Sequence, residues 1–184
     1  MATILTVEGK TPGFGKNCFI APNATIVGDV EMGNDCSIWF NAVVRGDVNS
    51  IRIGDKVNIQ DGVVIHGTYK KAGVIIGNDV SIGHNAIVHG CTIQDRVLIG
   101  MGAIVMDNAE IGKNSIIAAG AVVTEGTKVE SGTIYGGVPA RKIKDIPPDL
   151  IAGQIERIAN SYLTYAGWFQ DHNEAPRHQP HRQP

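Results

Sequence analysis

An aliphatic side chain recurs at every sixth position along much of this chain. The longest unbroken series is Ile93, Ile99, Val105, Ile111, Ile117, Val123 and Val129. An earlier series is Ile20, Ile26, Met32, Ile38 and Val44, and after a three-residue insertion the spacing resumes at Ile53 and Ile59. The residue two places before each later aliphatic is small, as at Ala103, Ala109, Ser115, Ala121 and Thr127. Such regularity indicates one structural unit stacked on copies of itself.

A period of six matches neither common secondary structure. An α-helix repeats its inward face about every 3.6 residues and a strand about every 2 residues. Three short strands per turn produce the observed spacing, if each six-residue unit forms one side of a triangular coil and points its aliphatic anchor inward. Glycine and asparagine then serve the corners. The composition, 43% hydrophobic but only 5% aromatic, suits flat layers of Ile, Val and Ala. The sequence therefore predicts an all-β fold.

This repeat resembles the hexapeptide-repeat family over about residues 11–141. The resemblance implies a left-handed parallel β-helix, which we expect to occupy residues 1–141. A different pattern follows Pro147 and Pro148, where apolar residues are spaced by three and four, as in an amphipathic helix. They are Ile151, Ile155, Ile158, Tyr162, Tyr165 and Phe169. We expect residues 142–171 to carry a C-terminal α-helix that packs on the β-helix, and the Pro- and Gln-rich residues 172–184 to be disordered.

The six-residue spacing is interrupted around the central histidines. We interpret the steps from Ile59 to Val64 and from Ile82 to Ile87 as five residues. The next step, from Val64 to Ile76, is twelve and includes the loop "GTYKKAG". The segments "NIQDGVVIHG" (58–67) and "SIGHNAIVHG" (81–90) superimpose with an offset of 23, which aligns Asp61 with His84 and His66 with His89. With these anchors, all four polar residues lie two places after an inward side chain.

Counting sides places His66 and His89 on one side of the triangle, one coil apart. Neighbouring strands lie about 4.8 Å apart, so the two imidazoles can converge on one point. His84 lies on a different side and can serve the equivalent point on a neighbouring molecule, which predicts a homotrimer with three shared sites. Three neutral imidazoles and an open fourth position suit catalytic Zn²⁺, and Fe²⁺ or Co²⁺ would also fit. Ordinary surface histidines are the simpler alternative.

The segments "RGDVNSIRIGDKVNIQDGVVIHG", "IGHNAIVHGCTI" and "GGVPARKI" resemble the γ-class carbonic anhydrases over nearly the whole chain. The resemblance implies reversible hydration of carbon dioxide to bicarbonate by a metal-activated hydroxide. It places the metal ligands at His66, His84 and His89. It implies that Gln60 orients the reactants, with Asn58 beside it, and that Tyr162 matches the family's active-site tyrosine. Arg45 and Asp47 correspond to subunit-interface residues, and Asp61 is expected to be their ionic partner.

Composition excludes several other function classes. The net charge of -2 and the pI near 6.3 provide no basic surface for nucleic acid. No stretch approaches the roughly 20 apolar residues that span a bilayer, and the segment "MATILTVEGKTPGFGK" lacks the long apolar core of an export signal, so we expect no export. Three widely spaced cysteines, Cys18, Cys36 and Cys91, suit a reducing compartment. We therefore expect a cytoplasmic protein that acts on a small molecule, without nucleic-acid or membrane partners.

The sequence is also compatible with two other functions. Many hexapeptide-repeat proteins are acyltransferases that use acyl-coenzyme A, although such a reaction has no need of three converging imidazoles. The chain can also be a metal-binding trimer with little or no catalysis. Glutamates that carry protons to buffer in the best-studied relatives are absent here, since Val48 follows Asp47 and the loop contains Lys70 and Lys71 without a carboxylate.

Overall fold

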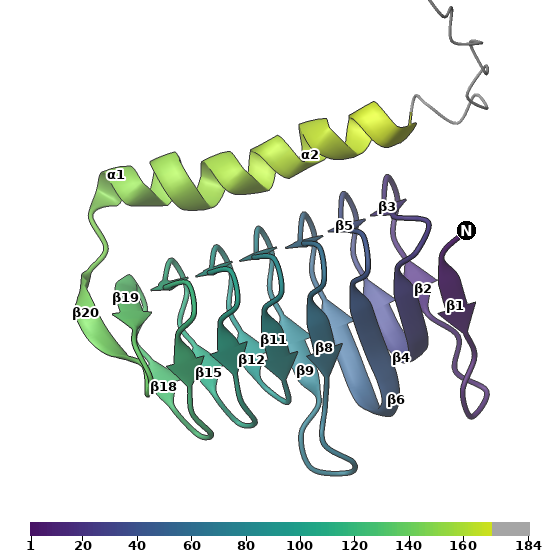
Figure 1. The fold of residues 1–184 in the computed structure, drawn as a ribbon, viewed down its shortest axis with the longest axis horizontal. Coiled ribbons are helices and arrows are strands. Elements are labelled where there is room, and N and C mark those ends of the chain that lie inside the picture. The colour runs from purple at the N-terminus through teal and green to yellow at the C-terminus, as the bar shows by residue number, and fades with distance from the viewer. Residues whose placement is uncertain (171–184) are drawn as a thin grey trace, which may run out of the picture.

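The computed structural model describes residues 1–170, which form a triangular parallel β-helix of about seven turns with a helical segment along one side (Figure 1). The predicted fold class is confirmed. The expected disordered tail, residues 172–184, lies outside the described residues. No helix within residues 1–170 is long and apolar enough to cross a membrane. Among the strands of residues 1–170, those of neighbouring turns pair in parallel, and only β19 with β20 is antiparallel.

One side of the triangle is called here the histidine face, because two of its central strands end at His66 and His89. Its strands are β1 (Thr3–Leu5), the first halves of β4 (Thr25–Met32) and β6 (Val43–Ile53), β8 (Val64–His66), β11 (Ile87–His89), β14 (Ile104–Val105) and β17 (Val122–Val123). The outward side chains in its middle form an aliphatic row in register. They are Val43, Val64, Ile87, Ile104 and Val122.

The second side, called here the polar face, continues the same sheet around the bends of β4 and β6. Its other strands are β2 (Gly13–Phe14), β9 (Val74–Ile76), β12 (Thr92–Ile93), β15 (Glu110–Ile111) and β18 (Lys128–Val129). The outward side chains in the middle of this face form a row that is mostly charged or polar. The row is Glu31, Arg52, Ile75, Thr92, Glu110 and Lys128. Such a surface suits contact with water.

The third side, called here the helix face, is covered by the C-terminal helical segment. Its strands are β3 (Phe19–Ile20), β5 (Ser37–Ile38), β7 (Asn58–Ile59), β10 (Ser81–Ile82), β13 (Leu98–Ile99), β16 (Ile116–Ile117), β19 (Thr133–Gly136) and β20 (Arg141–Asp145). The covering segment comprises α1 (Pro148–Leu150), a π-helical stretch, η1 (Ile151–Glu156), and α2 (Arg157–Gln170). It begins at Pro148, later than the start of the predicted range 142–171 because residues 141–145 form β20, and it runs back along the stack toward β3 (Figure 1).

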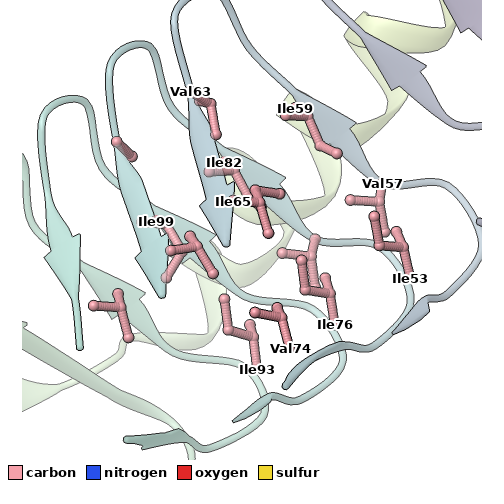
Figure 2. Close-up of a cluster of buried hydrophobic side chains, with 14 of the residues drawn as sticks. Ile53, Val57, Ile59, Val63, Ile65, Val74, Ile76, Ile82, Ile93 and Ile99 are labelled. Atoms are coloured by element: carbon pink, nitrogen blue, oxygen red, sulfur yellow. The ribbon is translucent and has the colours of Figure 1, made fainter. Parts of the chain in front are cut away.

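Aliphatic anchors from the three sides fill the interior in layers, as Figure 2 shows for the central coils. Ile59, Ile82 and Ile99 stack in register along the helix face and are completely buried. Corner residues in the left-handed backbone region close the turns, and several are asparagines, such as Asn85 with φ 58°. Asparagine tolerates this region better than most residues because its short side chain can bond to nearby backbone.

Two of the inward anchors differ from those predicted. Ile65 and Val88 are completely buried, whereas Val64 and Ile87 are 38% and 37% exposed. The steps from Ile59 and from Ile82 are therefore six residues, and His66 and His89 lie one place after an anchor rather than two. The prediction failed because both positions in each pair are aliphatic. The outward row of the histidine face is apolar too, so hydrophobicity alone could not distinguish inside from outside.

The genuine irregularities lie beside these positions. Gly28 pairs with Gly46 but Val30 pairs with Ile51, which confirms the predicted three-residue insertion and locates it within β6. A second insertion, the loop at residues 67–73, separates Ile65 from Ile76. The step from Val88 to Ile93 is one residue short, and Gly90 occupies that corner with φ 55°.

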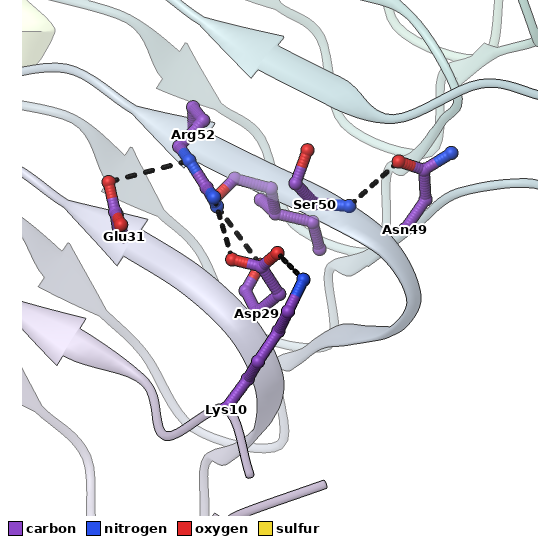
Figure 3. A network of polar contacts seen from close by, with 7 residues as sticks. Lys10, Asp29, Glu31, Asn49, Ser50 and Arg52 are labelled. Carbon is purple, nitrogen blue, oxygen red and sulfur yellow. Dashed lines mark hydrogen bonds and ion pairs between the residues drawn. The ribbon is translucent and has the colours of Figure 1, made fainter. Parts of the chain in front are cut away.

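A polar network joins the N-terminal segment to the bend of β4 (Figure 3). Lys10 Nζ lies 2.5 Å from Asp29 Oδ2, and Arg52 Nη2 lies 2.7 Å from Asp29 Oδ1. The Asp29 side chain is only 15% exposed, whereas Glu31, which contacts Arg52 at 3.4 Å, is 71% exposed. The hydrogen bond from Lys10, followed by the contacts with Arg52, holds the pKa of Asp29 below its usual value despite partial burial.

We expect Asp29→Asn to lower the free energy of unfolding by about 1–2 kcal/mol at pH 7, because two cationic side chains lose a carboxylate partner. The pKa of Asp29 is lower in the folded protein than its value of about 3.9 in the unfolded chain. The ionised carboxylate therefore stabilises the fold above about pH 3.9, and this stabilisation is lost as the pH falls through the lower folded-state pKa. The difference from wild type should therefore shrink at pH 3. Urea unfolding at fixed protein concentration measures both values. Glu31→Gln is the control, expected to cost less than about 0.5 kcal/mol; an equal loss would contradict the role of Asp29.

Candidate metal centre

His66 and His89 face each other across two neighbouring strands. They are paired in register at the ends of β8 and β11, as expected from the 23-residue offset. Each follows a buried anchor directly, so its side chain points out of the triangle at the corner. His66 Nδ1 lies 3.2 Å from His89 Nε2, and the ring centroids are 5.2 Å apart. The strand pairing thus brings one nitrogen of each ring to a common point.

The other nitrogen of each ring contacts a carboxylate. His66 Nε2 lies 3.1 Å from Asp47 Oδ1, and His89 Nδ1 lies 2.5 Å from Asp107 Oδ1. Asp47 belongs to the three-residue insertion in β6 and also accepts a hydrogen bond from Arg45 Nη1 at 2.5 Å. The insertion therefore supplies an orienting carboxylate for His66.

Both carboxylates are ionised near neutral pH. Partial burial alone would raise the pKa of Asp47, but hydrogen bonds from Arg45 and His66 outweigh it and leave the pKa below its usual value. Burial likewise opposes the hydrogen bonds from Thr68 and His89 that lower the pKa of Asp107. The pKa of His66 is lowered, first by partial burial and then by the nearby Arg45, although Asp47 acts in the opposite direction. His66 is therefore neutral at pH 7.

The proton positions leave an electrostatic conflict that a cation would resolve. An ionised carboxylate only accepts hydrogen bonds, so His66 carries its proton on Nε2 and His89 carries its proton on Nδ1. When both rings are neutral, the lone pairs of His66 Nδ1 and His89 Nε2 face each other at 3.2 Å, whereas a second proton on His89 would make Nε2 a hydrogen-bond donor to His66 Nδ1. Two ligands at 2.0–2.1 Å around a tetrahedral zinc ion stand about 3.3 Å apart. The two imidazoles therefore fit a divalent metal, with the outer carboxylates that such ligands usually have.

His84 lies apart from this pair, at the turn that follows the helix face. Its Nδ1 lies 2.8 Å from Asp61 Oδ2, and its Nε2 lies 3.5 Å from the hydroxyl of Tyr162 on α2. Burial, and then the nearby Asp61, raise the pKa of Tyr162 to about 12, so the hydroxyl keeps its proton. Among residues 1–170 of a single chain, no three His, Cys, Asp or Glu side chains converge as a metal site. Within one chain, Asp61 pairs with His84 rather than with Arg45 or Asp47.

Asn58 and Gln60 gather around His84 and not around the facing pair. Gln60 Nε2 donates to Asn58 Oδ1 at 3.0 Å, and Asn58 Nδ2 donates to Ser81 Oγ at 2.7 Å. All three side chains are buried on the helix face. Gln60, His84 and Tyr162 line one end of a groove of about 470 Å³ between that face and the helix. The rest of its wall is largely aliphatic, including Leu98, Ile116 and Ile158.

The chain therefore carries two separate half-sites. One is the His66–His89 pair with Asp47 and Asp107, and the other is His84 with Asp61, Gln60 and Tyr162. Sequence reasoning missed Asp107 and its hydrogen-bond partner Thr68. The residue count gave no direct signal for Asp107, because Val88 pairs with Val105 and Met106 therefore occupies the position that corresponds to His89 on the next coil. Thr68 lies in a loop, where the six-residue count gives no position.

Comparison with known proteins places the chain in a family. A family model described as bacterial transferase hexapeptide (six repeats) matches residues 13–46 and 90–125. A carbonic anhydrase of Geobacillus kaustophilus is 40% identical over 167 residues, covering 91% of each chain. Gamma carbonic anhydrase 1, mitochondrial, of Arabidopsis thaliana is 39% identical over 175 residues, covering 92% of this chain. The chain belongs to the γ-class carbonic anhydrase family.

The plant γ carbonic anhydrase is longer, and the match spans 62% of its length. A solved structure of a hexapeptide transferase family protein from Anaplasma phagocytophilum superimposes with a TM-score of 0.86 at 36% identity, covering 91% of this chain and 98% of that one. The γ-class fold is thus shared with proteins that are named as transferases.

Proposed function

We propose that the protein binds a divalent metal at subunit interfaces of a homotrimer and catalyses the reversible hydration of carbon dioxide to bicarbonate. His66 and His89 of one subunit and His84 of its neighbour would hold the metal. The observation that carries the proposal is the pair of ring nitrogens, His66 Nδ1 and His89 Nε2, that lie 3.2 Å apart, each on a ring whose other nitrogen contacts a carboxylate. Zn²⁺ is the metal that we favour, and Fe²⁺ or Co²⁺ suits the same ligands.

The histidine face supports assembly with a second copy of the chain. The helix face is already covered and the polar face is mostly charged, but the histidine face presents its aliphatic row to solvent. Val64, Ile87 and Met106 are each more than a third exposed there. Burying such a row against a neighbouring subunit is favourable by about 25 cal/mol per Å² of apolar surface. The same contact would bring the neighbour's His84 half-site toward the facing pair.

The remaining site residues bind and orient the reactants in this proposal. A bound divalent ion supplies a hydroxide nucleophile at neutral pH. Asn58 and Ser81 fix the amide of Gln60 in one orientation, so its second N–H and its carbonyl oxygen remain for carbon dioxide, water or bicarbonate. Tyr162 keeps its proton and can donate a hydrogen bond beside His84. Asp47, Asp61 and Asp107 hold the three imidazoles in the required tautomers.

Stopped-flow measurement of carbon dioxide hydration tests the proposal. The protein purified after growth with added Zn²⁺ or Co²⁺ should contain about one metal per chain and should hydrate carbon dioxide until a chelator removes the metal. We expect Gln60→Ala to lower kcat/KM by roughly 100-fold while the metal is retained, because an orienting hydrogen-bond donor is lost. Gln94→Ala, which removes an exposed glutamine distant from the histidines, should leave kcat/KM unchanged.

The buffer dependence of the rate reports on the missing proton acceptors. Because Lys70 and Lys71 occupy the loop after His66, small buffers such as imidazole should raise the turnover. Stoichiometric metal without any metal-dependent rate would reject catalysis and leave a metal-binding trimer. Absence of metal after supplemented growth would reject the site itself.

Acyl transfer from acyl-coenzyme A is the second candidate, and the groove beside His84 is the observation that favours it. Its volume of about 470 Å³ far exceeds the size of carbon dioxide, and its wall is mainly aliphatic. Release of free thiol from acetyl-coenzyme A in the presence of small amines and alcohols, unaffected by a chelator, would support this alternative over hydration.

A further inference from the structure

A chain of hydrogen bonds crosses three coils and ends at the facing pair. Thr68 Oγ1 donates to Asp107 Oδ2, and the other oxygen of the same carboxylate, Oδ1, lies 2.5 Å from His89 Nδ1. The Asp107 side chain is only 22% exposed. Both of its oxygens are therefore engaged, one by a neutral hydroxyl and one by an imidazole N–H. Such a carboxylate cannot rotate without breaking one of the two bonds.

The loop at residues 67–73 holds the hydroxyl in place. Thr68 N donates to Ala72 O at 2.8 Å, and Asn49 Nδ2 donates to Thr68 O at 3.2 Å. These bonds fix the backbone on either side of the Thr68 side chain. The loop therefore brings a rigidly held hydroxyl to a carboxylate 39 residues away in the sequence.

The backbone at Gly90, in the corner between β11 and β12, leaves room for the Asp107 carboxylate. A Cβ atom at Gly90 would lie 2.4 Å from Asp107 Oδ1, which is closer than non-bonded atoms approach, and Gly90 has φ 55°. The shortened corner after Val88 thus favours glycine because of the nearby carboxylate, since residues with side chains adopt a similar φ at other corners. Gly90, Thr68 and Asp107 together determine how the His89 ring is held.

We propose that Asp107, itself held by Thr68, is a positioning residue that fixes His89 with its proton on Nδ1 and its Nε2 lone pair directed at His66. The metal-binding consequence rests on the proposed function, but the tautomer of His89 does not. Neutral histidine in water prefers the proton on Nε2, so the opposite tautomer needs a fixed acceptor at Nδ1. Asp107 provides that acceptor, and Thr68 prevents it from turning away.

Nitrogen-15 NMR of the metal-free protein tests the tautomer directly. Long-range proton–nitrogen correlation spectra at about pH 8, assigned with His89→Gln, should show the wild-type His89 protonated on Nδ1. Asp107→Leu should convert it to the Nε2-protonated form. Asp107→Asn should retain the wild-type tautomer, because its amide oxygen still accepts from Nδ1 and its amide nitrogen can donate to the Thr68 hydroxyl. A wild-type His89 protonated on Nε2 would overturn the inference.

Metal affinity provides the second readout, by competition of Co²⁺ with a coloured chelator. We expect Asp107→Leu to weaken binding about 10–100-fold and Thr68→Val to weaken it less, with Thr68→Ser restoring the wild-type value. Glu125→Gln is the matched control, since it removes a negative charge from the groove beside His89 and Asp107 and should change the affinity less than about threefold. If Asp107→Leu does not fold, the comparison of Thr68→Val with Thr68→Ser tests the inference in its place. Equal tautomer populations and equal metal affinities in these two variants would contradict the inference.

These outcomes separate the inference from the proposed function. The predicted tautomer in wild type and its loss in Asp107→Leu would support positioning by Asp107 even if no carbon dioxide is hydrated. Normal hydration with an unchanged tautomer in Asp107→Leu would reject positioning while the proposed function stands.

Discussion

Co-expression of a His66→Ala chain with a His84→Ala chain is expected to restore about one quarter of the metal sites that either variant lacks alone. In the proposed trimer, each site takes His66 and His89 from one subunit and His84 from the next. A site is intact when a His84→Ala chain provides the facing pair and a His66→Ala chain provides His84. With equal expression and random assembly, each of these conditions holds for about half of the positions.

Elemental analysis of the purified mixed protein measures the restored fraction, and the carbon dioxide hydration rate per metal should equal the wild-type rate. Each variant expressed alone should lose most of its metal, because two imidazoles do not complete the ligand set. The control is co-expression of His66→Ala with His89→Ala. These two ligands come from the same subunit, so no mixed interface is complete and no metal should return. Recovery in the control, or none in the test pair, would contradict ligation between subunits.

The periodic part of the fold was predictable because its physics is local and repeated. An aliphatic residue every sixth position can be buried only if the chain turns three times per coil, and the offset of 23 residues then puts His66 beside His89. The inward anchors were misassigned only at Val64–Ile65 and Ile87–Val88, where the outward position is also aliphatic and a neighbouring insertion or shortened corner interrupts the six-residue count. That ambiguity has a physical cause, since this face lacks a covering element within residues 1–170 and is suited to a second chain.

The part of the candidate site that escaped prediction depends on contacts between coils. Asp107 was missed because it lies one residue past the position that corresponds to His89 on the next coil, and nothing in its own segment "VMDNAEIG" distinguishes it from a corner residue. Asp61 was expected to pair with Arg45 and Asp47, but in one chain it contacts His84, since both lie at the same turn of successive coils. In the proposed trimer, His84 would meet the other histidines only through assembly, and a single chain does not display that contact.

Replacing Ile87 by glutamate should separate the proposed trimer into monomers and abolish its metal binding. Ile87 lies at the centre of the aliphatic row, between Val64 and Ile104, two residues before His89. Burying an unpaired carboxylate there costs at least about 3 kcal/mol per interface, enough to raise the dissociation constant by more than a hundredfold. Light scattering coupled to size-exclusion chromatography should report one chain, with metal content close to zero.

The matched control places the same substitution on another face, in the preceding coil of the stack. Ile75 lies on the polar face between Arg52 and Thr92, and it is 56% exposed. Ile75→Glu should leave the trimer and its metal intact, because this row faces solvent and gains a favourable charge beside Arg52. Circular dichroism should show that both variants keep the β-helix, since neither side chain points into the core. A trimeric Ile87→Glu protein with full metal would mean that the subunits meet elsewhere and that His84 cannot complete the site in the proposed way.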